Sequence, residues 1–360
     1  MFRGSLSINP LIKQPVIFYG APAVPHESGD PIPRIIFYGA PAPPHESGDP
    51  RTKSDKIRIW YFESNLIYKM IFHKNIAAIA DKYDYFILDL WGVIHDGAKT
   101  YPGVLDSLKH LRKLNKKVCF LSNAPRRSAK VAELLSQLGI GEDLYDFIIT
   151  SGEATYLYLQ SNRGKELIGS PNNNVYRYYY IGPQKDADLL NGLGYEEAAD
   201  ASLADFAVIT GFEDGNYNID EKLPQLRAAA QNNLTMICVN PDLVVIKQSG
   251  EELLCAGVLA LEYQKLGGKV AYFGKPYNLV YEQVFQLFSI RDKTRILAVG
   301  DGIETDILGA NKNQIDSALI AGGILANDLK VKYGQFPDAD LMQKICDKYQ
   351  SYPTFILGGL

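Results

Sequence analysis

Short apolar runs that alternate with segments of helical spacing constrain the fold of this chain more than any other feature. The runs Tyr85–Leu90, Lys117–Ser122 and Phe147–Thr150 predict buried strands. Between them, Pro102–Asn115 and Ser128–Leu138 have the spacing of helices with one apolar face. Alternating strands and helices predict an α/β fold, in which a parallel sheet has helices on both faces.

The same alternation returns toward the C-terminus, where further strands are predicted at Val270–Phe273, Ile296–Val299 and Ser317–Ile320. Between Gly152 and Gly257 lies a long insertion with its own α/β pattern. An insertion of this length is enough for a second compact domain. We therefore predict one domain built from residues 73–152 and 258–360, with a second α/β domain, residues 153–257, inserted into it.

A duplicated segment precedes this α/β pattern. Ile17–Pro31 and Ile36–Pro50 are nearly identical and rich in Pro and Gly. They lack strand or helix periodicity over most of their length, so the leader, residues 1–72, is predicted to be largely extended or disordered. Its last part, residues 51–72, could instead hold one strand or a helix docked on the domain, and the sequence does not decide. His26 and His45 repeat with the two copies. A paired metal site is the weaker interpretation, because the duplication itself explains both histidines.

Composition argues against several classes of protein. A formal net charge of −4 does not favour a general nucleic-acid binder. The four cysteines form no CxxC pattern, so neither a zinc site nor a disulfide framework is expected, and reduced buried thiols of a cytoplasmic protein are the simpler interpretation. No apolar run approaches the ~20 residues that span a bilayer, so we expect no membrane segment.

Polar residues follow the first two predicted strands of the main domain. Asp89 comes directly after an apolar run, where a buried acid needs a cation or hydrogen bonds. Ser122 and Asn123 end the second run. Each could also serve as a simple cap of the segment that follows.

Two further polar clusters follow later strands. Lys275 stands before Pro276, which is able to begin a helix, and a cation at a helix N-terminus makes sense if an anion shares the site. Asp301 and Asp306 flank a glycine-bearing turn, and Asp306 is expected to open the next helix. Two close carboxylates repel unless a cation compensates, and hard oxygen ligands suit Mg²⁺.

Parallel strands present their carboxyl ends at one edge of a sheet, so the four clusters should meet. Together they supply a nucleophilic carboxylate, a hydroxyl, a lysine and a pair of carboxylates. These are the groups that phosphoryl transfer requires, because a metal and a lysine neutralise phosphate charge while a carboxylate attacks.

With these four clusters the sequence resembles the haloacid dehalogenase (HAD) superfamily, because all four motifs of that family occur in order over residues ~75–360. The inserted domain resembles the α/β cap of subfamily IIA, the NagD-like phosphatases. Two other segments, Thr150–Thr155 and Asn240–Asp242, also look like that branch. The resemblance implies a Rossmann-like core with helices on both faces of a parallel sheet, and a hydrolase that acts on a small phosphorylated metabolite.

The resemblance also implies roles for individual residues. Asp89 would attack phosphorus and form an aspartyl phosphate, while Ser122, Asn123 and Lys275 would bind the phosphoryl group. The Mg²⁺ ligands would be Asp89, the backbone carbonyl of Trp91 and Asp301, with Asp306 acting through water or orienting Lys275. Caps of this type often contribute to dimers, so a homodimer is one expectation.

One position departs from the family pattern. The phosphatases carry an acid/base aspartate two residues after the nucleophile, and here that residue is Trp91. His95 and Asp96, just downstream, are candidate substitutes. The alternative is that they only form a hairpin turn with Gly97. The segment also resembles the DxWGVxHDG pattern of one class IIA group, in which Trp91 would be a family trait.

Three functional hypotheses remain open at the level of sequence. The first is a magnesium-dependent phosphatase that acts through Asp89. The second is a protein that binds a phosphorylated ligand with little or no turnover, because Trp91 replaces the acid. The third, an interaction protein that acts through its duplicated leader, depends on that leader alone.

Overall fold

The computed structural model describes residues 70–171, 174–247 and 249–360. Both copies of the duplicated segment lie outside these residues, and so does the metal site considered for His26 and His45. Everything described below belongs to the unit Asn65–Leu360.

A seven-stranded parallel sheet forms the larger part of this unit, with the order β1-β14-β13-β12-β2-β3-β4. The strands are β1 (Ile71–His73), β2 (Tyr85–Leu88), β3 (Lys117–Ser122), β4 (Phe147–Thr150), β12 (Ile296–Gly300), β13 (Asp316–Ile320) and β14 (Phe355–Leu357). The predicted α/β class with a parallel sheet is confirmed. The predicted end of the leader at residue 72 lies too late, because Ile71 and Phe72 belong to β1 and pair with β14.

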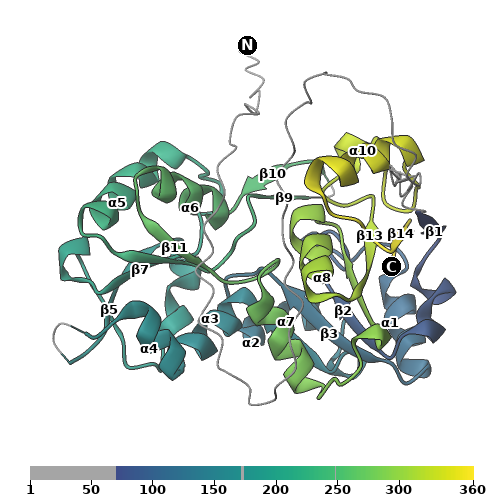
Figure 1. The fold of residues 1–360 in the computed structure, drawn as a ribbon, viewed down its shortest axis with the longest axis horizontal. Helices are drawn as coiled ribbons and strands as arrows, with labels where there is room; N and C mark the ends of the chain where they lie inside the picture. The colour runs from purple at the N-terminus through teal and green to yellow at the C-terminus, as the bar shows by residue number, and fades with distance from the viewer. Residues whose placement is uncertain (1–69, 172–173, 248) are drawn as a thin grey trace, which may run out of the picture. The chain divides into compact units, whose positions relative to one another are not determined.

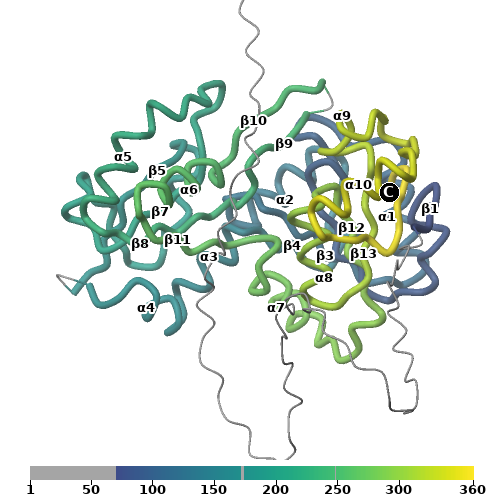
Figure 2. The backbone as a smooth tube through the Cα atoms, turned by 45° about the horizontal axis from the view of Figure 1, so that its top comes forward, coloured from purple at the N-terminus to yellow at the C-terminus, as the bar shows by residue number. Residues whose placement is uncertain are grey.

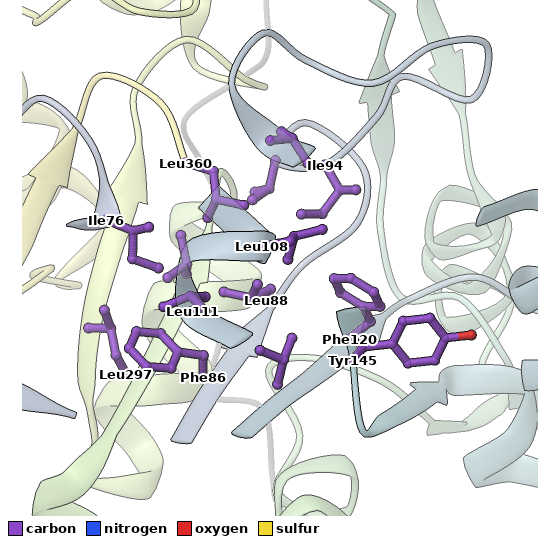
Figure 3. Close-up of a cluster of buried hydrophobic side chains, with 14 of the residues drawn as sticks. Ile76, Phe86, Leu88, Ile94, Leu108, Leu111, Phe120, Tyr145, Leu297 and Leu360 are labelled. Atoms are coloured by element: carbon purple, nitrogen blue, oxygen red, sulfur yellow. The ribbon is translucent and has the colours of Figure 1, made fainter. Parts of the chain in front are cut away.

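Helices cover both faces of this core sheet, since successive side chains of a strand point to opposite faces. Phe86 and Leu88 of β2 pack with Leu108 and Leu111 of α1, as Figure 3 shows, whereas Ile87 packs in the cluster on the other face. The first face carries α1 (Val104–Lys113) and α2 (Ser128–Gln137), and the second carries α7 (Asn278–Leu287) and α8 (Leu308–Asn313). Two more helices, α9 (Ala326–Leu329) and α10 (Ala339–Tyr349), follow β13.

A second parallel sheet, which we call the cap sheet, has the order β11-β8-β7-β5-β6. Its strands are β5 (Arg177–Ile181), β6 (Glu196–Glu197), β7 (Phe206–Ile209), β8 (Thr235–Cys238) and β11 (Lys269–Tyr272). One face packs against α5 (Ile219–Gln231) and α6 (Ala256–Lys265), which lie side by side in Figure 1. The other packs against α3 (Ser151–Gln160), α4 (Asn162–Ile168) and the 3₁₀ segment η4 (Gln184–Leu190).

The end of the inserted domain was predicted too early. We expected residues 258–360 to return to the core, with Val270–Phe273 as a core strand. Instead α6 packs on the cap sheet, and β11 pairs with β8 as its edge strand. The chain re-enters the core only after β11, and the inserted domain therefore extends past Gly257 to about Tyr272. Residues of strand β11 have no local feature that assigns them to one sheet or the other.

A two-stranded antiparallel hairpin connects the cap sheet to α6. It consists of β9 (Val244–Ile246) and β10 (Glu252–Leu254), which lie next to each other in Figure 2. The remaining short elements are η1 (Ile76–Ala78), η2 (Ala80–Lys82), η3 (Glu142–Leu144), η5 (Ala201–Leu203), η6 (Lys293–Arg295) and the π-helical turn η7 (Ile303–Ile307).

The expectation that the cysteine thiols are buried is confirmed. All four are buried and unpaired, namely Cys119, Cys238, Cys255 and Cys346. No helix in the described ranges is long and apolar enough to cross a membrane.

Candidate active site

The strand order places the candidate site at the centre of the core sheet. From β2 the chain moves through β3 and β4 in one direction, and β12, β13 and β14 lie on the other side. The boundary between β12 and β2 is therefore a topological switch point, where open α/β sheets bind ligands beyond the strand ends. Asp89 follows β2, Asp301 follows β12, and Ser122 ends β3.

Lys275 contacts acids from two of the other polar clusters that were identified in the sequence. Its ammonium nitrogen lies 2.5 Å from Asp89 Oδ1 and donates to Asp306 Oδ1 at 2.8 Å. The lysine is only 3 % exposed. Burial alone would lower its pKa, but the charges of Asp306 and Asp89 outweigh burial and raise the pKa of Lys275 above its ordinary value. The lysine is thus held as a cation between two acids.

The helix N-terminus expected at Lys275 is not there. The helix α7 begins at Asn278, with Tyr277 as its N-cap, and Lys275 therefore precedes the helix by more than one position. Two carboxylates contact its ammonium group, and an anion beside Lys275 stays a prediction.

Three carboxylates meet beside this lysine. Asp89, Asp301 and Asp306 are all buried, and each offers an oxygen within 4.8 Å of the others. Burial, reinforced by Asp306, raises the pKa of Asp301 to about 7, and burial likewise raises that of Asp89 well above its ordinary value. Three acids share one ammonium group, and a divalent cation would relieve their repulsion. The donor set fits Mg²⁺, which prefers carboxylate oxygens.

Gly92 allows the backbone of the loop after β2 to approach Asp301 closely. Gly92 has φ +80°, and a Cβ built on it would lie 1.8 Å from Asp301 Oδ2. No other residue type fits at this position without moving Asp301. The same oxygen, Asp301 Oδ2, accepts a hydrogen bond from the backbone N–H of Ile324 at 2.7 Å, which fixes the carboxylate.

Asn123 is fully engaged within the protein. Its Oδ1 accepts from the backbone N–H of Lys275 at 2.7 Å, and its Nδ2 donates to the Lys275 carbonyl and to Asp242 Oδ1, at 3.2 and 2.7 Å. Burial raises the pKa of Asp242 to about 6. Asn123 therefore positions the lysine, and the phosphate contact expected of its side chain stays a prediction. The Asn240–Asp242 segment was the only sequence signal for this partnership.

Trp91 points toward the hairpin of the inserted domain. Its indole N–H donates to the backbone carbonyl of Ile246 in β9 at 2.9 Å. A Cβ at Gly97 would lie 2.8 Å from two carbons of the indole ring, so the ring packs directly on that turn. The two contacts fix the side chain two residues after Asp89, where the family that the sequence resembles would carry an acid.

His95 and Asp96 form a turn. His95 Nδ1 accepts from the backbone N–H of Gly97 at 2.9 Å, and Asp96 Oδ1 accepts from the N–H groups of Ala98 and Lys99 at 3.0 and 2.9 Å. Burial lowers the pKa of His95 to about 4, so its imidazole is neutral. These bonds support the hairpin interpretation, and an acid/base role for either residue stays a prediction.

Ion pairs join the segment after β3 to the inserted domain. Arg126 Nε donates to Asp186 Oδ1 at 2.9 Å, and Lys130 Nζ donates to Asp188 Oδ1 at 2.6 Å. Asp186 is buried, whereas Lys130 is partly exposed and Asp188 is exposed. Neither pair could be predicted from the sequence, because nothing near Arg126 or Asp186 in the chain indicates a partner sixty residues away.

Known proteins share this fold and these motifs. A family model for haloacid dehalogenase-like hydrolases matches residues 86–196, and a second model, for HAD-hydrolase-like proteins, matches residues 272–347. The chain is 27% identical to the sugar-phosphatase AraL of Bacillus subtilis over 66% of this chain and 82% of that protein. It is 26% identical to human glycerol-3-phosphate phosphatase over 64% of this chain and 76% of that protein.

A solved structure agrees with these matches. A haloacid dehalogenase-like hydrolase from Brucella suis 1330 superimposes with a TM-score of 0.65 at 28% identity, covering 79% of this chain and 98% of that one. The fold and the acidic site define a Rossmann-like hydrolase with an inserted α/β cap. The chain belongs to the haloacid dehalogenase superfamily, and its homologues are phosphatases of the NagD-like subfamily IIA, as the sequence resemblance indicated.

Proposed function

We propose that this chain is a magnesium-dependent phosphatase that hydrolyses a small phosphorylated metabolite through an aspartyl phosphate on Asp89. The observation that carries the proposal is the buried ammonium group of Lys275 between Asp89 and Asp306, with Asp301 beside them. This arrangement combines a nucleophile, a fixed cation and ligands for a metal. Relatives named sugar-phosphatase and glycerol-3-phosphate phosphatase support the same reaction class.

In this mechanism the chain's own residues bind and orient the phosphoryl group. Lys275 and the Ser122 hydroxyl hold its oxygens, and Asp89 attacks phosphorus from the end of β2. Asp306 keeps Lys275 in place through the 2.8 Å bond. Asp89, Asp301 and the backbone carbonyl of Trp91 would hold Mg²⁺, with Asp306 near it. When bound, the metal supplies positive charge against the phosphoryl oxygens.

The test is release of inorganic phosphate from a panel of phosphorylated metabolites, with and without Mg²⁺, by wild type and Asp89→Asn. We expect turnover by wild type only, and only with the metal. Asp84→Asn is a matched control, because Asp84 precedes the same strand at its other end and pairs with Arg295 on the surface. Equal turnover by wild type and Asp89→Asn would exclude Asp89 as the nucleophile.

A second candidate function is favoured by Trp91. Because the indole replaces the acid and is bonded to Ile246, the site could bind a phosphorylated ligand and Mg²⁺ with little turnover. Tight binding of a metabolite without phosphate release, together with gain of phosphatase activity in Trp91→Asp, would support this candidate over the first. Formation of a homodimer and location in the cytoplasm stay predictions, and sedimentation and cell fractionation test them.

A further inference from the structure

The polar side chains of the loop after β2 make their hydrogen bonds within the protein. The indole N–H of Trp91 is used by the Ile246 carbonyl, and the ring is packed on Gly97. A Trp side chain offers no other polar atom. The residue two positions beyond the nucleophile therefore has no proton for an oxygen that departs from phosphorus.

His95 and Asp96, the two neighbours that could act as the acid instead of Trp91, make hydrogen bonds within their own hairpin. His95 Nδ1 accepts the Gly97 N–H, which places the imidazole proton on Nε2, and Nε2 is buried with no hydrogen-bond partner in the described part of the chain. Asp96 Oδ1 accepts two backbone N–H groups of the same hairpin. Both residues thus stabilise the turn that supports the Trp91 ring.

Asp242 is the remaining acid close to Lys275 in the ranges that the structure describes, apart from the three of the metal cluster. It is buried, and its Oδ1 accepts from Asn123 at 2.7 Å. This bond directs the carboxyl oxygen to the residue that positions Lys275. The geometry therefore assigns Asp242 to the support of the lysine.

We propose that the substrates are activated phosphoryl compounds, whose leaving group departs as a stable anion without being protonated. This inference rests on the proposed function. Acyl phosphates, phosphoanhydrides and phosphates of acidic phenols share this chemistry, whereas phosphate esters of ordinary alcohols do not. General acid catalysis is worth roughly 10²–10⁴ in rate for a poor leaving group, and it adds little when the leaving anion is already stable.

The reaction balances without a general acid. An Asp89 oxygen forms a bond to phosphorus while the bond from phosphorus to the leaving oxygen breaks, and that oxygen keeps the electron pair as a carboxylate, phosphate or phenolate. Water then attacks the phosphorus of the aspartyl phosphate. The bond between phosphorus and the Asp89 oxygen breaks, the carboxylate is restored, and the products are inorganic phosphate and one proton released to solvent.

The experiment measures kcat/KM with Mg²⁺ for aryl phosphates whose phenols range from 4-nitrophenol to unsubstituted phenol. Acetyl phosphate, pyrophosphate and glycerol phosphate complete the series and distinguish acyl, anhydride and alkyl donors. We expect a steep fall of kcat/KM as the leaving group becomes more basic. Trp91→Asp restores an acid and should raise the glycerol phosphate rate relative to the 4-nitrophenyl phosphate rate by roughly 10²–10⁴.

His95→Gln, Asp96→Asn and Asp242→Asn test the three residues that could act as an acid instead. If none of these changes alters the slope of kcat/KM against leaving-group basicity, the proposal is supported. A shallow slope in wild type overturns it, and so does a slope that becomes steeper in any of the three variants. Turnover of glycerol phosphate without turnover of acetyl phosphate and 4-nitrophenyl phosphate also overturns it. Failure of the proposed function is a separate result, namely equal rates for wild type and Asp89→Asn.

Discussion

The indole N–H of Trp91 donates to the backbone carbonyl of Ile246 at 2.9 Å, across 155 positions of sequence. Trp91 belongs to the loop that follows Asp89, and Ile246 belongs to the hairpin β9–β10 of the inserted domain. This bond joins the loop after β2 directly to the inserted domain. The side chain of Trp91 therefore has a structural role in linking the two parts of the chain.

Trp91→Phe should loosen the hairpin. Phenylalanine keeps an aromatic ring but has no donor, so the Ile246 carbonyl loses its partner. A single hydrogen bond of this kind contributes about 0.5–1.5 kcal/mol, which corresponds to amide exchange that is roughly 2–10 times faster in β9 and β10. Hydrogen exchange followed by mass spectrometry measures this directly. Strands β5 and β7 serve as the internal control, and unchanged exchange in the hairpin would contradict the assignment.

The local parts of this fold follow from the sequence. β3 has the predicted bounds Lys117–Ser122, because an apolar run that ends in a turn is enough to define a buried strand. Asp89 and Asp301 were expected to meet because each follows such a run, and they do. In each case the information lies within a few residues of the position that it describes.

The parts that could not be predicted depend on distant pairing. Residues of β11 resemble a core strand, and only their pairing with β8 places them in the cap sheet. The partner of Trp91 is a backbone carbonyl, which every residue carries, so no sequence signal identifies Ile246. The hydrogen bonds of Asn123 to Lys275 span 152 positions, so the sequence did not indicate them, and the phosphate contact of Asn123 stays a prediction.

Asn123→Ala should destabilise the protein and reduce activity together. The substitution leaves the buried Lys275 N–H and one oxygen of Asp242 without partners, at a cost of about 1–3 kcal/mol for each unsatisfied group. Urea denaturation and phosphate release are the two measurements. Asn232→Ala is the matched control, since Asn232 is exposed and bonds only the carbonyl of Ala228 four residues earlier. Full activity in Asn123→Ala would contradict the role of Asn123 in positioning Lys275.

Asp242 should make the unfolding free energy fall as pH rises. Burial raises its folded-state pKa to about 6, against about 3.9 in an unfolded chain. Between those values the native state binds more protons than the unfolded state. The stabilisation that protonated Asp242 contributes is therefore present at low pH and is lost as pH rises through 6. Relative to Asp242→Asn, wild type should lose up to about 3 kcal/mol between pH 4 and pH 7 in EDTA. If the unfolding free energies of wild type and Asp242→Asn changed with pH in the same way, Asp242 would not be the cause of the loss.

The two ion pairs between the core and the inserted domain should differ in strength. Arg126→Met leaves the buried carboxylate of Asp186 without its cation, and loss of one partner of a buried pair costs about 3–5 kcal/mol. The partial exposure of Arg126 favours the lower end of that range. Lys130→Met removes an exposed pair between neighbouring segments and should cost no more than about 1 kcal/mol. Equal losses in denaturant unfolding would show that burial of Asp186 does not matter.

Addition of Mg²⁺ should stabilise the wild-type protein through the three buried carboxylates. A ligand at 100 times its Kd stabilises the folded state by about 2.7 kcal/mol, and repulsion within the cluster is relieved at the same time. Asp301→Asn removes one ligand charge while an oxygen remains to accept the Ile324 N–H, so this variant should fold but gain little from the metal. Glu304→Gln is the matched control, because Glu304 lies in the same π-helical turn but is exposed and outside the cluster. Thermal unfolding with Mg²⁺ and with EDTA measures the difference, and an equal rise in Tm for wild type and Asp301→Asn would place the metal elsewhere.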